Sequence, residues 1–216
     1  MTTIGGNIHR LDGYDKVTGK AVYVDDIVLD GMLYGRTIRS TVPRGRLRSI
    51  TFDPAFDWTG IVRVTAKDIP GMGGENVVHL MIDDQPYLVD DIINHPDEAV
   101  ALVAADTPER ADAAARHVIV DVESLPAQLS YEDSPITMNE RVIERGDLAA
   151  AFAAADRIVE GTYRSGLQEQ LYIEPQGMLA IPREDGGIIV KGSLQCPYYV
   201  HRAIKRLFGL GDDKVA

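Results

Sequence analysis

The sequence contains a single cysteine, Cys196, among its 216 residues. One thiol excludes an intrachain disulfide, and it cannot supply the four thiolates that hold a common iron–sulfur cluster. The five histidines are scattered and form no close set with cysteine and carboxylate residues, so a zinc site has little support. If the protein takes part in redox chemistry, its electron carriers are therefore expected on other chains.

The sequence also lacks a long apolar run and an excess of positive charge. No apolar stretch approaches the roughly 20 residues needed to cross a bilayer, and the N-terminus has no basic region followed by an apolar one. Asp and Glu outnumber Lys and Arg 33 to 22, a formal net charge of −11. Such a surface repels phosphate backbones, so nucleic-acid binding is not expected. These absences predict a soluble, cytoplasmic protein with no membrane partner.

What is present is an ordinary globular composition, with 45% hydrophobic and 25% charged residues. The length allows one sizeable domain or two small ones. Strand-like and helix-like segments alternate over residues 1–127, and Thr107 is placed to cap a helix that starts at Pro108. The expected strands are rich in β-branched or aromatic residues: 21–27, 32–40, 47–52, 61–66, 99–105 and 118–123.

A second region follows an ordered connector over residues 128–145. It opens at Gly146, with Asp147 as the expected N-cap of a short helix. Two strands are expected at 157–163 and 187–194, and a final amphipathic helix at 197–208, which Gly209 or Gly211 would end. The K-V-A that follows is expected to begin another strand. The mixture of elements predicts an α+β fold.

The N-terminus carries the most specific pattern of the chain, R-x-D-x3-K-V-T-G-x-A-x-Y-x2-D, from Arg10 to Asp26. It resembles the opening of the large, molybdenum-binding subunit of the xanthine dehydrogenase and aldehyde oxidase family. The resemblance continues through Asp68–Gly71, residues 99–120 and residues 123–127. It then extends through Gly146–Asp147, Val159–Tyr163 and Gln168–Pro175, so that it covers essentially the whole chain.

The resemblance implies a hammerhead-type α/β domain over residues 1–127, the connector 128–145, and the first, incomplete part of an α+β molybdopterin-binding domain over 146–216. The family's glycine-rich cofactor loop and its catalytic glutamate have no counterpart in these residues. We therefore expect the 216-residue chain alone to be inactive and to hold no cofactor.

Gln168 is the residue to which the resemblance assigns chemistry. In the family, a glutamine at the start of the segment Q-E-x-x-Y-x-E donates a hydrogen bond from its side-chain amide to an oxo ligand of the molybdenum. Gln168 is thus the expected catalytic and cofactor-binding residue, and no protein residue is expected as a metal ligand. Without the resemblance, a glutamine that satisfies backbone groups would be the simpler interpretation. Glu169 and Glu174 are not expected to act as an acid–base pair, because their spacing places them on opposite faces of a strand.

The activity implied is hydroxylation of an aldehyde or N-heterocycle carbon with water as the oxygen source. Molybdopterin-bound molybdenum would serve the complete enzyme, with iron–sulfur clusters and FAD on other chains or domains. The expected partners are the remainder of the molybdenum subunit, the iron–sulfur and FAD subunits and a small-molecule substrate, and a homo-oligomer stays open. The alternative is a non-catalytic module that docks the remaining enzyme chains.

Overall fold

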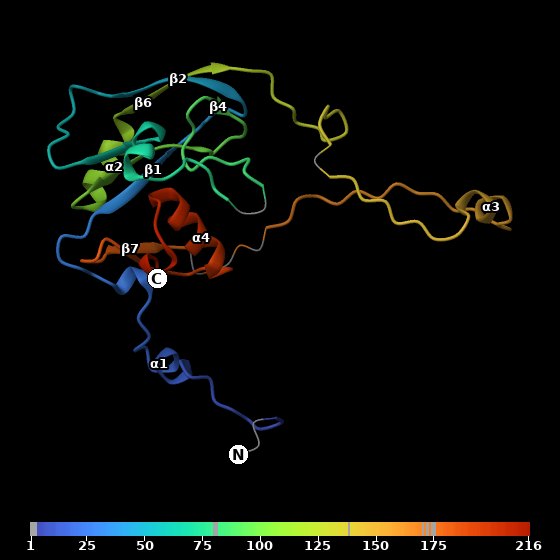
Figure 1. Ribbon diagram of the computed structural model, residues 1–216, viewed down its shortest axis with the longest axis horizontal. Coiled ribbons are helices and arrows are strands. Elements are labelled where there is room, and N and C mark those ends of the chain that lie inside the picture. Colours follow the sequence, from blue (N-terminus) through green and yellow to red (C-terminus); the bar gives the residue numbers. More distant parts are fainter. Residues whose placement is uncertain (1–3, 80–81, 138, 170, 172, 174–175) are drawn as a thin grey trace. The chain divides into compact units, whose positions relative to one another are not determined.

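The computed structural model describes residues 4–79, 82–137, 139–169, 171, 173 and 176–216 (Figure 1). The chain forms two compact units. The main unit joins Met1–Pro126 to Gln176–Ala216, and the inserted unit is Ala127–Pro175.

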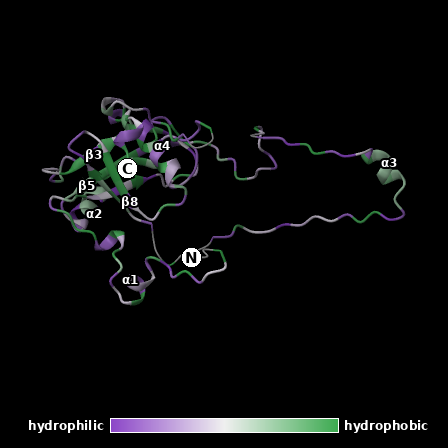
Figure 2. Ribbon diagram, turned by 60° about the horizontal axis from the view of Figure 1, so that its bottom comes forward, coloured by the Kyte–Doolittle hydropathy of each residue, from purple (hydrophilic) through white to green (hydrophobic). Residues whose placement is uncertain are grey.

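Two antiparallel three-stranded sheets form the N-terminal part of the main unit. The first has the order β1-β5-β3, with β1 at Tyr34–Arg39, β5 at Ala99–Ala105 and β3 at Val62–Thr65. The second has the order β4-β2-β6, with β4 at Ile92–Ile93, β2 at Gly45–Phe52 and β6 at Val118–Ser124. Central β5 is apolar on both faces, and the face with Ala101, Val103 and Ala105 is buried, whereas Leu102 on the other face is 38% exposed. Its apolar character is visible beside that of β3 in Figure 2.

Helix α2, Pro108–Arg116, packs against β1 and β5. Thr107 caps it, because its side chain accepts a hydrogen bond from the Arg110 amide. Ala111 and Ala114 are fully buried, and these small side chains let the helix lie close to the sheet. They form one cluster with Ile61, Val103 and Ala105. A second cluster of Val89, Ile93 and Val100 fills the space beneath β2 and β6.

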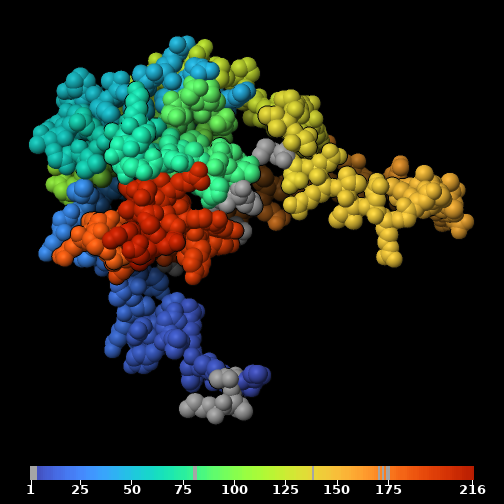
Figure 3. Space-filling view, in the orientation of Figure 1, coloured from blue at the N-terminus to red at the C-terminus, as the bar shows by residue number. Residues whose placement is uncertain are grey.

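The C-terminal part of the main unit is a β-hairpin followed by a helix. Strands β7 (Met178–Pro182) and β8 (Ile188–Gly192) pair antiparallel, and α4 covers Pro197–Phe208. Gly209 ends α4 in the left-handed region, with φ of 62°. Figure 3 shows this C-terminal part in red and orange against the teal and green surface of the N-terminal part. The last residues of the chain return to β8, where Val215 forms a parallel bridge with Ile188.

Several short helices lie outside the sheets. Helix α1 covers Gly13–Val17, and 3-10 turns lie at Val24–Asp26, Ala66–Asp68, Pro70–Met72 and Asp212–Lys214. In the inserted unit, α3 covers Leu148–Ala153 and begins at Asp147, whose carboxylate accepts the Ala150 amide at 2.9 Å. None of the helices in the described ranges is long and apolar enough to span a bilayer.

Three of the expected strands are wrong. Residues 21–27 form no strand: Val24–Asp26 is a 3-10 turn, and the Asp26 carboxylate accepts the Tyr23 amide at 2.8 Å, which closes the chain on itself. Residues 157–163 form no strand, since no neighbouring strand within the described residues pairs with them. Strands β4 and β7 were not expected from the sequence. The K-V-A end of the chain forms no regular strand: Lys214 ends a 3-10 turn, and Val215 makes a single bridge with Ile188. The strands expected at 32–40, 47–52, 61–66, 99–105, 118–123 and 187–194, and helices α2, α3 and α4, are confirmed with small changes at their ends.

Candidate functional site

Gln168 lies in the inserted unit, in a stretch without regular secondary structure. Its side chain is exposed, and it makes no hydrogen bond to any residue that the structure describes. The simpler interpretation of this glutamine, that it satisfies nearby backbone groups, therefore finds no support among the described residues. The side-chain amide is left available as a neutral donor to a ligand.

The surroundings of Gln168 are equally open. Leu167 is fully exposed, and Glu169 is exposed and has an interaction partner. Leu171 has a positive φ of 46°, a conformation that costs energy for a branched side chain and marks an irregular backbone at this point. Glu174, the second carboxylate of the segment, lies outside the described residues.

The inserted unit is held together by few interactions. An ion pair joins Arg164 to Glu132, with 3.3 Å between Nη2 and Oε1, and links the stretches of chain before and after α3. Both side chains are largely exposed, so this pair contributes little to stability. The large apolar side chains of α3 are uncovered, with Leu148 63% and Phe152 54% exposed. Figure 2 shows this helix in the colour of apolar residues.

The described residues offer no metal centre of their own. They contain no group of three or more His, Cys, Asp or Glu side chains that could hold an ion. The Gln168 amide is exposed and has no partner among the described residues, so it is a hydrogen-bond donor available to a ligand that brings its own metal.

The N-terminal motif makes local structure. Arg10 and Lys16 both form ion pairs with Asp12, and their hydrogen bonds lower the pKa of that carboxyl to about 2. Asp12 precedes helix α1, and Gly19, with φ of 70°, follows its end. These residues organise a turn, and further along the motif Val24 and Asp25 line a cavity of about 420 Å³.

The main unit has several surface cavities, and one of about 420 Å³ beside residues 24–36 and 177–179 has a mixed polar and apolar lining. A groove of about 190 Å³ lies between β8 and α4 and is lined by Val190, Val200, Ile204 and Val215 among others. Cys196, at the start of α4, is exposed and has φ of 55°. Tyr198 and His201 also line this groove.

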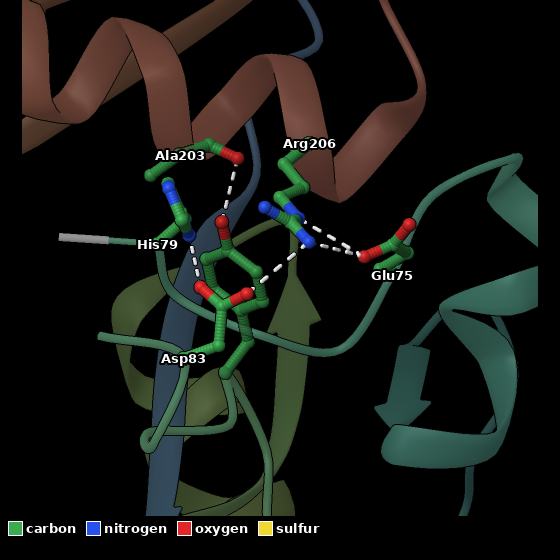
Figure 4. Close-up of polar contacts among 6 residues, drawn as sticks. Glu75, His79, Asp83, Ala203 and Arg206 are labelled. Carbon is green, nitrogen blue, oxygen red and sulfur yellow. Dashed lines mark hydrogen bonds and ion pairs between the residues drawn. The ribbon is translucent and has the colours of Figure 1, made fainter. Parts of the chain in front are cut away.

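The sequence did not predict a polar cluster that joins α4 to residues 75–87. Arg206 lies between the carboxylates of Glu75 and Asp83, and Asp83 also contacts His79 (Figure 4). No local signal reveals such a cluster, because its partners lie 123 and 131 positions apart in the sequence.

Comparison with known proteins now identifies the two parts of the chain. Residues 18–126 match the family model described as aldehyde oxidase and xanthine dehydrogenase, a/b hammerhead domain. The chain belongs to this family. Residues 131–216 match the molybdopterin cofactor-binding domain, so that the hammerhead and cofactor-binding modules are both present.

Relatives from two bacteria support the same assignment. The chain is 33% identical over 219 residues to a probable xanthine dehydrogenase subunit of Bacillus subtilis, covering 95% of this chain and 29% of that protein. It is 30% identical over 223 residues to the nicotinate dehydrogenase large molybdopterin subunit of Eubacterium barkeri, covering 98% of this chain and 52% of that protein. The chain thus spans about a third to half of the length of these relatives.

A solved structure agrees with the fold. The aldehyde oxidoreductase of Desulfovibrio gigas superposes with a TM-score of 0.82 at 26% identity, covering 95% of this chain and 25% of that chain. The fold is therefore that of a molybdenum hydroxylase large subunit, with α+β architecture.

Proposed function

We propose that this chain forms part of a molybdenum hydroxylase that hydroxylates an aldehyde or N-heterocycle carbon with water as the oxygen source. The observation that supports this proposal concerns Gln168. It lies within the residues matched by the cofactor-binding model, and its side-chain amide has no hydrogen-bond partner among the described residues. The bound cofactor would supply the oxidation chemistry and the activation of water. The chain's own contribution would be to hold and orient that group.

The Gln168 amide would donate a hydrogen bond to an oxo ligand of the cofactor. A neutral donor suits this position, because it can stabilise negative charge on oxygen without delivering a proton. The hammerhead module, residues 18–126, would serve as the rigid base of the assembly.

Completion of the site would come from sequence outside these 216 residues. The two bacterial relatives named above are about two to three and a half times as long. Iron–sulfur clusters and FAD would lie on other chains or domains, and the 216-residue chain alone would be inactive. A soluble, cytoplasmic location fits this assignment.

The test compares Gln168→Ala with Gln128→Ala in the assembled, cofactor-loaded enzyme. Gln128 is also exposed in the inserted unit, but its amide is already donated to the Ser130 carbonyl at 2.7 Å. Loss of one donor to a developing oxyanion lowers kcat roughly 10-fold to 1,000-fold, so we expect that loss for Gln168→Ala only. Molybdenum content is measured in parallel. Equal turnover of the two variants at equal metal content would contradict the role of Gln168.

The alternative function is a non-catalytic module that docks the remaining enzyme chains. The apolar side chains left exposed in the inserted unit favour it, among them Ile143, Val159 and Tyr163, each above 90% exposed. This alternative would be supported if the wild-type assembly holds molybdenum and turns over, and if neither substitution changes its turnover.

A further inference from the structure

The loop that begins at Gly73 is in close backbone contact with the end of helix α4. A Cβ atom placed on Gly74 would lie 1.9 Å from the carbonyl oxygen of Leu207, and one placed on Gly209 would lie 2.2 Å from the carbonyl oxygen of Gly73. Only glycine permits this approach on both sides. The contact is therefore built into the backbone and does not depend on long, mobile side chains.

An ion-pair cluster lies next to this contact. The Glu75 amide donates to the Arg206 carbonyl at 3.1 Å, and the Glu75 carboxylate accepts from Arg206 at 2.8 Å and 3.0 Å. The guanidinium also lies 3.4 Å from the Asp83 carboxylate, and Asp83 contacts His79 on its other side (Figure 4). Arg206 thus meets two carboxylates from one loop, and its side chain is only 33% exposed.

A third set of contacts fixes the middle of the helix. The Tyr87 hydroxyl donates to the Ala203 carbonyl at 2.6 Å. Tyr87 is itself positioned by Asn76, whose side-chain oxygen accepts the amides of Tyr87 and Leu88 at 3.1 Å each. Leu207 packs against the buried cluster of Ala66, Ile69 and Leu88. Polar, apolar and backbone contacts therefore converge on one face of α4.

These contacts cross the boundary between the two family modules. Glu75, Asp83 and Tyr87 belong to the residues matched by the hammerhead model, whereas Ala203 and Arg206 belong to those matched by the cofactor-binding model. We infer that residues 73–79 and 82–88 form an interdomain clamp on α4, and that Glu75 and Arg206 couple the two modules so that this helix unfolds together with the hammerhead core. The inference does not depend on the proposed hydroxylase activity.

The test measures hydrogen exchange of the α4 amides, residues 197–208, in the 216-residue chain. Trp58 reports the hammerhead core separately, because its ring packs edge-on against Phe52 and Phe56. The variants are Arg206→Met, Glu75→Gln and the double variant. Arg202→Met is the matched control, since Arg202 lies on the same helix and its guanidinium contacts the ring of Tyr199 instead.

Each clamp variant is expected to speed exchange of α4 about tenfold, as for loss of hydrogen bonds to a charged group, while Trp58 fluorescence stays native. The double variant should match Arg206→Met alone, because losing Arg206 already removes the ion pair with Glu75 as well as the one with Asp83. Arg202→Met should change exchange less than twofold. The inference is overturned if α4 of the wild-type chain exchanges like an unstructured peptide, or if the effects of the two single changes simply multiply.

Gly209→Ala provides a second test that leaves every charge in place. The added methyl group would collide with the Gly73 carbonyl. Faster exchange confined to α4 and residues 73–88 would support the clamp, and unchanged exchange in both segments would contradict it.

Discussion

The hydroxyl of Tyr87 donates to the backbone carbonyl of Ala203 across 2.6 Å, although 116 positions separate the two residues. Burial raises the pKa of this hydroxyl above its usual value of about 10. The folded chain therefore holds the Tyr87 proton more tightly than the unfolded chain does.

This shift predicts a loss of stability at alkaline pH. The contribution of Tyr87 is fully present below about pH 10 and is lost as the pH rises through the folded-state pKa. Urea midpoints measured between pH 8 and pH 11 should fall more steeply for the wild-type chain than for Tyr87→Phe. Parallel curves for the two proteins would show that Tyr87 does not titrate in this way.

The cap of helix α2 gives a prediction at neutral pH. Thr107→Ala removes the acceptor of the Arg110 amide and should lower the free energy of unfolding by about 1 kcal/mol. Thr107→Ser keeps the hydroxyl and should stay close to wild type. Chemical denaturation of the three proteins provides the comparison, and equal losses for Ala and Ser would assign the effect to the methyl group.

The buried alanines of α2 leave no room for a larger side chain. Ala114→Leu should cost about 1–3 kcal/mol, because the added atoms push the helix from β1 and β5. Ala113→Leu, on the partly exposed side of the same helix, should be tolerated with a much smaller loss. Thermal unfolding distinguishes the two variants. Similar melting temperatures would mean that α2 does not pack as described.

The ion pair of Asp112 with Arg36 predicts an acid-side effect. The hydrogen bond from Arg36 lowers the pKa of Asp112, so its stabilisation is present above the unfolded pKa of about 4 and is lost as the pH falls through the folded pKa. Asp112→Asn should reduce the difference in urea midpoint between pH 7 and pH 3. Both side chains are partly exposed, so high salt should reduce the effect as well.

Metal analysis of the purified 216-residue chain should find far less than one molybdenum atom per chain, because the chain spans about a third to half of its relatives. The assembled enzyme should retain the metal under the same purification. One molybdenum per isolated chain would show that these residues suffice to hold the cofactor.

The sequence predicts most accurately the elements whose ends are defined by local chemistry. Helix α2 starts after Thr107 and α4 ends at Gly209, as the capping residues indicate. Residues 21–27 have the alternation of a strand, but the Asp26 carboxylate accepts the amide of Tyr23, three positions earlier, and this contact favours a turn. Residues 157–163 have β-propensity without a partner strand among the described residues, and propensity alone does not form a sheet.

The candidate site likewise has one part that the sequence indicates and one part that only the structure reveals. Gln168 was identified through resemblance, and the structure adds that its amide has no described partner. The contacts of the clamp residues Glu75 and Tyr87 with α4, and the role of Arg206 on that helix, could not be predicted. Each of these residues taken singly has the appearance of an ordinary surface side chain. Only the fold brings them together.

The main unit is discontinuous in the chain, and this has a consequence for synthesis on the ribosome. Residues 73–88 emerge first and must wait, without their partners, until the whole inserted unit and then α4 have been translated. The entropic cost of closing a loop rises only with the logarithm of its length, by about 0.6 kcal/mol for each doubling. The insertion of residues 127–175 therefore delays folding of the nascent main unit, but it lowers the stability of the folded main unit only slightly.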